Sequence, residues 1–189
     1  MSEYDVVGVE ESGGPMPPLK WEEGLFEQIV RGHQFFGEWD ARYPVKGQTA
    51  SDAPSGSVSL FADFFGDGHF RLTATHFFSA LLTFYHFHVS QLSPLGMVRI
   101  RHFELCFRSQ GLEPTVERFR AFNHLQVNLG FFLLTTRGSK RLLINPTKSY
   151  HDWKGKFFFI RREVITVTME FCEFVPIPKK NLKIPKGVA

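Results

Sequence analysis

The chain has 189 residues, of which 43% are hydrophobic and 22 are Phe, and its formal net charge is +3. This length is typical of a single domain, and the apolar content is enough for a well-formed core. The longest uncharged stretch, residues 72–95, is interrupted by three His and several hydroxyl side chains. These polar groups exclude a membrane span and favour a buried helix.

Two further features concern the compartment. The opening residues Met1 to Asp5 include two acids, whereas a secretory signal needs a basic start followed by an apolar run. Cys106 and Cys172 are isolated cysteines in apolar surroundings, which is typical of buried reduced thiols and not of a disulfide or a metal pair. We therefore expect an intracellular protein, in either the nucleus or the cytoplasm.

Charge is distributed unevenly along the chain. Residues 1–56 contain ten Asp or Glu and four Lys or Arg, whereas residues 57–189 contain nine and eighteen, a net of +9. Clustered cations bind polyanions by releasing counterions, so this pattern is compatible with a nucleic-acid partner. A solvated surface with a modest positive bias is the commoner explanation.

The first 57 residues divide into two parts. Residues 1–19 are acidic and rich in Gly and Pro, which predicts a disordered segment. Residues 20–57 are predicted to form a short helix, Trp21 to Val30, and a turn-rich linker. The apolar face of this helix is expected to contain Trp21, Leu25, Phe26, Ile29 and Val30.

The pattern predicts a Phe-rich globular domain over residues 58–174. It begins with an extended segment, Val58 to Phe65, which a turn at Gly66-Asp67-Gly68 ends. A helix capped by Thr73 or Thr75 follows, and apolar side chains surround it almost completely. We expect this helix to form the buried centre of the domain.

Two more helices are predicted after it. Ser93-Pro94 is a strong helix start, and Gly111 ends that helix after about Gln110. Arg101, Glu104 and Arg108 share one face, on which Glu104 can pair with Arg108. Pro114 opens the next helix, with Arg118, Arg120, Asn123 and His124 facing outward and Val116, Phe119, Phe122 and Leu125 facing inward. The two helices form a helix-turn-helix-like pair.

The period then becomes that of strands. Val127–Thr136 and Arg141–Ile144 are predicted to form a hairpin that turns at residues 137–140. A helical turn at Ser149–Lys154 and a buried strand at Phe157–Ile160 follow, and the Pro- and Lys-rich residues 175–189 form an extended tail. The predicted fold is therefore mainly α with a small β component (α+β): a compact helical core with a β-hairpin, a disordered N-terminal segment and an extended C-terminal tail.

No catalytic, cofactor, metal or small-molecule site is predicted. Asp63-Phe64-Phe65-Gly66 is similar to the Asp-Phe-Gly of kinases, but no Gly-rich phosphate loop accompanies it. His86 and His88 are two positions apart, so they point to different sides of a helix, and no cysteine pair completes a zinc site. We expect a protein that is not an enzyme. A metal-dependent nuclease using Asp63, Asp67 and Asp152 is the enzyme alternative.

Basic residues provide the candidates for nucleic-acid contact. Arg118 and Arg120 lie on the outer face of the second predicted helix, although an ordinary αα corner explains such a pair more often than DNA reading does. The basic C-terminal region is the better candidate for unspecific RNA contact. The full set of candidates is Arg118, Arg120, Arg161, Arg162, Lys179, Lys180, Lys183 and Lys186.

Several segments also resemble a known family. They are Trp21–Val30, His88–Gly96, Arg101–Ser109 and Trp153–Phe159. Together they look like the plant gypsy-type transposase domain, which occurs in gag-like proteins of long-terminal-repeat retrotransposons and in host copies derived from them. The resemblance runs from about Trp21 through the Lys-rich tail.

This resemblance implies a nonenzymatic structural or interaction domain, because the family has no agreed catalytic residues. Family members continue past an Ile-Pro-Lys…Leu-Lys-Ile-Pro stretch into coiled coils, whereas only four residues follow Ile177–Pro185 here. We therefore expect an isolated or truncated copy that contacts RNA, more than DNA, or self-associates. The alternatives are a metal-dependent transposase or nuclease and a helix-turn-helix-like DNA-binding protein.

Overall fold

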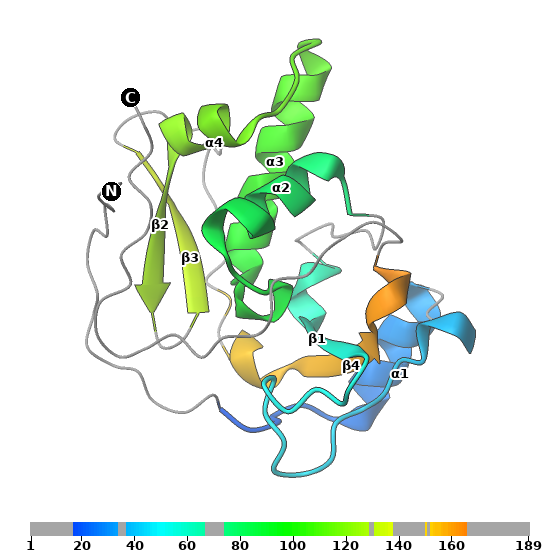
Figure 1. Cartoon of the computed structure of the whole chain (residues 1–189). Coiled ribbons are helices and arrows are strands. Elements are labelled where there is room, and N and C mark those ends of the chain that lie inside the picture. The colour runs from blue at the N-terminus through cyan, green and yellow to red at the C-terminus, as the bar shows by residue number, and fades with distance from the viewer. Residues whose placement is uncertain are drawn as a thin grey trace.

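The computed structural model describes residues 17–33, 37–66, 74–128, 131–137, 150 and 152–165. Over this part of the chain it is a compact α+β fold with four α-helices and two small antiparallel sheets, as predicted (Figure 1). The predictions for residues 1–16, Asp67, Thr73, Arg141–Ile144, Cys172 and the tail with its four lysines fall outside the described residues. The elements are α1 (Glu23–Gly32), β1 (Ser57–Phe61), α2 (His76–Tyr85), α3 (Pro94–Ser109), α4 (Val116–Phe122), β2 (Asn123–Asn128), β3 (Phe131–Thr136) and β4 (Phe157–Arg161).

The first sheet joins two distant parts of the chain. β1 pairs antiparallel with β4, so that Leu60 lies opposite Phe158, which confirms the buried strand predicted at Phe157–Ile160. On the other side of β4, the Arg42 amide donates to the Phe159 carbonyl (2.8 Å), and the Phe159 amide donates back to Arg42 (3.0 Å). Residues 58–61 and 157–160 are all buried. β4 has the continuous apolar sequence that is typical of a strand buried on both faces, whereas β1 includes the buried Ser59, whose hydroxyl donates to the Ala50 carbonyl.

The core begins earlier than Val58, where the sequence placed its start. Trp21 is buried and its indole Nε1 donates to the Phe157 carbonyl (3.0 Å), while the rings of Phe26 and Phe158 lie 5.7 Å apart. The predicted helix is therefore part of the domain and not a separate unit. Leu25, predicted on its apolar face, is 48% exposed, because it lies about 100° around the helix from Phe26.

Helices α2 and α3 begin at the predicted caps. Thr75 Oγ1 accepts from the Phe78 amide (3.2 Å), and Ser93 Oγ accepts from the Gly96 amide (3.1 Å). Helix α2 is less completely surrounded than expected, because Ala80 and Thr83 are exposed. Helix α3 ends at Ser109, and Gly111 adopts the left-handed conformation (φ 68°) that favours glycine.

The helix-turn-helix-like pair is not formed as predicted. Helix α4 has only seven residues and ends at Phe122, and Asn123, predicted to face outward, is buried at the start of β2. From Asn123 the chain is extended and pairs with β3, so that Leu125 faces inward from a strand opposite Leu134. β2 therefore pairs antiparallel with β3, with Asn128 opposite Phe131, where the sequence predicted one uninterrupted strand.

Candidate nucleic-acid interface

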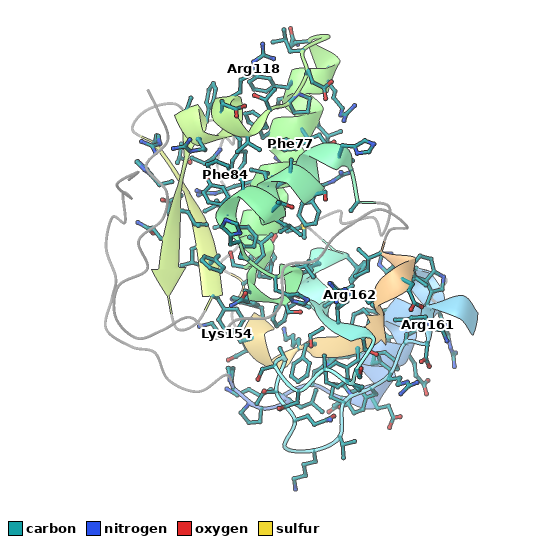
Figure 2. The ribbon with its side chains drawn as sticks, in the orientation of Figure 1. Phe77, Phe84, Arg118, Lys154, Arg161 and Arg162 are labelled. Carbon is teal, nitrogen blue, oxygen red and sulfur yellow. The ribbon has the colours of Figure 1, made fainter. Side chains whose placement is uncertain are left out.

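The structure separates the basic residues that the sequence proposed for nucleic-acid contact. Arg118 lies on α4 near the top of the molecule, well away from Arg161, the last residue of β4, and Arg162, the first residue of the 3-10 turn that follows (Figure 2). Arg161 is close to Glu163 (3.9 Å), and both side chains are largely exposed. The four tail lysines lie outside the described residues. No single surface joins the described candidates.

Arg118 and Arg120 point to different sides of α4. Positions two apart on a helix differ by about 200°, so the two side chains cannot share a face. The Arg118 Nη1 donates to the Glu113 carbonyl (2.6 Å), and its guanidinium lies 5.9 Å from the ring centre of Phe107 on α3. The Arg120 guanidinium lies 5.0 Å from the ring centre of Phe84, near the end of α2. Both are cation–π contacts, but they face different neighbours.

A third arginine joins Arg120 on the α2 side. Arg137 follows β3, and its amide donates to the Phe122 carbonyl (2.8 Å) while its Nε donates to the Asn123 carbonyl (3.2 Å). These bonds fix Arg137 at the C-terminal end of α4. The sequence placed Arg137 in a hairpin turn and gave no sign of this position, because it depends on the pairing of β3 with β2.

Arg120 and Arg137 both affect the pKa of the Tyr85 hydroxyl group. Burial raises the pKa of Tyr85 to about 12, and the positive charges of Arg120 and Arg137 oppose that rise. The ring of Tyr85 packs edge-on against Phe84, with centroids 5.0 Å apart. Phe84, Tyr85, Arg120 and Arg137 therefore form one group, which we call the α2–α4 surface.

The α2–α4 surface combines two properties used in binding single-stranded nucleic acid. Its two guanidinium groups can neutralise phosphates, and half-buried Phe84 presents an aromatic ring beside Arg120. The guanidinium groups also lie at the C-terminal end of α2, where the helix dipole favours cations. The chemistry of the surface therefore suits both stabilisation of the fold and binding of a ligand.

Carboxylates do not gather into a metal centre in the described part of the chain. No three His, Cys, Asp or Glu side chains there are placed to hold a metal ion. Of the three acids of the nuclease alternative, Asp152 lies 3.8 Å from Lys20 Nζ, Asp63 is in a short 3-10 turn after β1, and Asp67 is outside the described residues.

His88 is a buried helix cap, a role that sequence reasoning missed. Its Nδ1 accepts from the Ser90 amide (3.2 Å), and Gln91 Oε1 accepts from the His88 amide (3.1 Å), at the start of a 3-10 turn, Val89–Gln91. Burial, with a smaller effect from the nearby charge of Arg162, lowers the pKa of His88 to about 4. The imidazole is therefore neutral near pH 7.

This neutral histidine makes stability depend on pH. Because the pKa of His88 falls from 6.5 to about 4 on folding, only the unfolded chain binds a proton at His88 between these values. We expect the free energy of unfolding to decrease by roughly 3 kcal/mol as the pH is lowered through this window. Urea denaturation at a series of pH values measures it. His88→Asn keeps an acceptor for the Ser90 amide but no titrating group, so an unchanged pH dependence in this variant would contradict the assignment.

Comparison of the chain with protein-family models, with curated proteins and with solved structures found no match. Within the described residues, no helix combines the length and the apolar character needed to cross a membrane.

Proposed function

We propose that this chain is a nonenzymatic interaction domain of retrotransposon origin, gag-like in character, that contacts single-stranded RNA. The observation that carries the RNA contact is the Arg120 guanidinium over the Phe84 ring, beside Tyr85, whose pKa the charges of both Arg120 and Arg137 lower. The resemblance of the sequence to the gypsy-type domain supports the gag-like assignment, and the net charge of +9 over residues 57–189 supports an anionic partner.

The short length of α4 favours single-stranded RNA over duplex DNA. A helix of seven residues spans only about 10 Å, and Asn123 is buried, so α4 offers little for reading base edges in a major groove. Stacking on an aromatic ring needs an unpaired base, whereas guanidinium groups bind any phosphate backbone. The α2–α4 surface therefore suits unpaired nucleotides with little sequence preference.

Self-association is the second part of the proposal. Leu105, on α3, and Leu112, in the connection between α3 and α4, are 55% and 47% exposed. Large apolar side chains that are exposed to solvent are available for contact with another copy of the chain. Light scattering with size-exclusion chromatography measures whether the mass exceeds that of a monomer, and whether Leu105→Ser with Leu112→Ser restores a monomer.

The RNA contact predicts a specific loss of affinity. The double substitution Arg120→Ala/Arg137→Ala is expected to weaken binding of single-stranded RNA about tenfold or more, because two charged contacts to phosphate are lost. Each phosphate contact on a single strand contributes about 0.7 to the magnitude of the slope of log affinity against log salt concentration, so the loss of two contacts should make this slope shallower by about 1.4. Phe84→Leu, which removes the stacking ring and keeps apolar volume, should weaken binding about fivefold or more. Fluorescence anisotropy of a labelled oligonucleotide at several salt concentrations measures both losses of affinity and the change in the salt slope.

A matched control removes the same charge elsewhere. Arg31 and Lys46 are exposed, and Arg31 lies on α1, at the other end of the molecule from α4 (Figure 1). If Arg31→Ala/Lys46→Ala weakens RNA binding as much as the Arg120/Arg137 pair does, the interaction is a general effect of charge and the α2–α4 surface is not the site. Absence of RNA binding by the intact chain at low salt would contradict the proposal altogether.

A further inference from the structure

A lysine amine lies against aromatic rings where a short 3-10 turn meets the start of β3. Lys154 is the middle residue of the turn Trp153–Gly155, and its Nζ lies 4.9 Å from the ring centre of Phe131 and 5.9 Å from that of Trp153 (Figure 2). Both distances are within the range of cation–π contacts. The amine therefore faces two rings, one from its own turn and one from a strand that precedes it in the chain.

The two rings are held in place by the core. Phe131 is fully buried and Trp153 is 8% exposed, and their centroids lie 4.7 Å apart with the ring planes at 70°. Phe61 packs edge-on against both, with centroid distances of 5.8 Å to Phe131 and 4.6 Å to Trp153. Aromatic faces at a steep angle to each other can attract one cation from two sides.

Close backbone packing fixes the turn that carries Lys154. The Gly155 carbonyl accepts from the Lys20 amide (2.8 Å). A Cβ atom at position 155 would lie 2.7 Å from the Cβ atom of Lys20 and 3.1 Å from the Pro18 carbonyl oxygen, so this approach requires glycine. The backbone of Lys154 is therefore held close to the two rings.

No carboxylate of the described residues pairs with Lys154. The nearest acid in the sequence, Asp152, lies 3.8 Å from Lys20 Nζ, and both of these side chains are largely exposed. Burial lowers the pKa of Lys154, and no carboxylate charge opposes this shift. A primary ammonium is strongly hydrated, and aromatic rings replace only part of the water that burial removes. The position therefore suits a cation that needs less hydration than a primary ammonium.

We propose that Lys154 is an N-methylation site, and that Phe131 and Trp153 hold its methylated ammonium. Methylation keeps the positive charge, and it replaces N–H donors by methyl groups, so attraction to the rings is preserved while the need for water decreases. Nζ is 4.9 Å from the Phe131 ring centre, whereas carbon atoms are in contact at about 3.5–4.0 Å. The remaining distance is comparable with a carbon–nitrogen bond of about 1.5 Å, which leaves room for a methyl group.

The transfer requires a methyl donor of the sulfonium class and a separate methyltransferase. The ammonium of Lys154 first gives a proton to water, and the neutral amine then attacks the methyl carbon. An N–C bond forms while the C–S bond breaks, and the electron pair of that bond stays on sulfur. The sulfonium becomes a thioether, and the product is a methylammonium. Lys154 is half-buried, so part of its side chain is open to an enzyme.

Mass spectrometry of peptides from the chain, isolated from the cells that produce it, tests the modification directly. We expect methyl groups on Lys154 and not on Lys156, the matched control, which is a half-buried lysine of the same segment without a ring contact among the described residues. Absence of methyl groups from Lys154, or equal methylation of Lys154 and Lys156, would overturn the proposal. An acyl group on Lys154 would overturn it as well, because an amide has no charge for the rings to attract.

Reductive methylation of the purified chain tests whether the methylated amine fits against the rings. The NMR signal of dimethylated Lys154, identified by its absence from Lys154→Arg, should lie upfield of the other dimethyl-lysine signals, because two ring faces shield it. Methylation should also raise the melting temperature by about 2 °C more in the unsubstituted chain than in Lys154→Arg. An unshifted signal, or equal changes in melting temperature, would contradict the proposal. Neither measurement involves RNA, so this site and the α2–α4 surface can fail independently.

Discussion

Substitution of Glu104 by Ala is expected to lower the free energy of unfolding by about 3–5 kcal/mol, because it breaks a buried ion pair from one side. Glu104 is 2% exposed on α3, and its two carboxylate oxygens accept from Arg101 (2.9 Å) and Arg108 (3.1 Å). Arg101 donates to Glu104 through Nη1, while its buried Nε has no partner among the described residues, so loss of the carboxylate would leave a largely buried cation uncompensated. Chemical denaturation in urea measures the change.

Arg108→Ala provides the matched control for this prediction. Half of the Arg108 side chain is exposed, so water can replace much of its hydrogen bond to Glu104. We therefore expect Arg108→Ala to lower the free energy of unfolding by less than about 1 kcal/mol. Glu104→Gln keeps the shape of the side chain and one hydrogen-bond acceptor, so its loss of stability should lie between those of Glu104→Ala and Arg108→Ala. Equal losses for Glu104→Ala and Arg108→Ala would mean that the carboxylate is no more important than an ordinary surface partner.

Features set by a few neighbouring residues were predicted correctly from the sequence. Ser93 caps α3, Gly111 follows its end, and Glu104 pairs with Arg108 across one turn. Each depends on backbone groups or side chains within four residues, so the chain encodes it locally. The continuous apolar run at residues 157–160 likewise indicated a strand with both faces buried.

The start of β2 could not be decided locally. Phe119, Phe122 and Leu125 are spaced as on one face of a helix, which extended the predicted α4 beyond its end at Phe122. Leu125 also fits the alternation of a strand, and the pairing of β2 with β3 decides between the two. Such pairing depends on contacts that a short window of sequence does not contain.

The candidate sites show the same division. Arg118 and Arg120 were recognised as basic residues on a helix, but their separation follows from helix geometry and from which neighbours pack on each side. The position of Arg137 depends on the pairing of β3 with β2, which brings together segments that are separate in the sequence. The contact of Trp21 with Phe157 spans 136 residues and placed the first helix in the core for the same reason.

Phe103→Ala is the second substitution for which we expect a loss of about 3–5 kcal/mol, because it opens a cavity where three helices meet. The Phe103 ring is 1% exposed and lies 5.4 Å from Phe77 on α2, 4.2 Å from Phe107 on α3 and 5.2 Å from Phe119 on α4, measured between ring centroids. Large-to-small changes cost most where the surroundings cannot collapse, and rings on three elements limit such collapse. Thermal and urea denaturation measure the loss.

Phe107→Ala is the appropriate comparison, because Phe107 stacks on the same ring but is only half-buried. Its loss should be clearly smaller, since part of its surface already meets water. Phe103 also supports α4 through Phe119, so the folded Phe103→Ala variant should bind RNA more weakly at the α2–α4 surface than the folded Phe107→Ala variant does. If both substitutions lower the stability equally, or if the two folded variants bind RNA equally well, Phe103 does not hold α4 in place. The stability of the aromatic junction and the geometry of the RNA surface would then be separate properties of the fold.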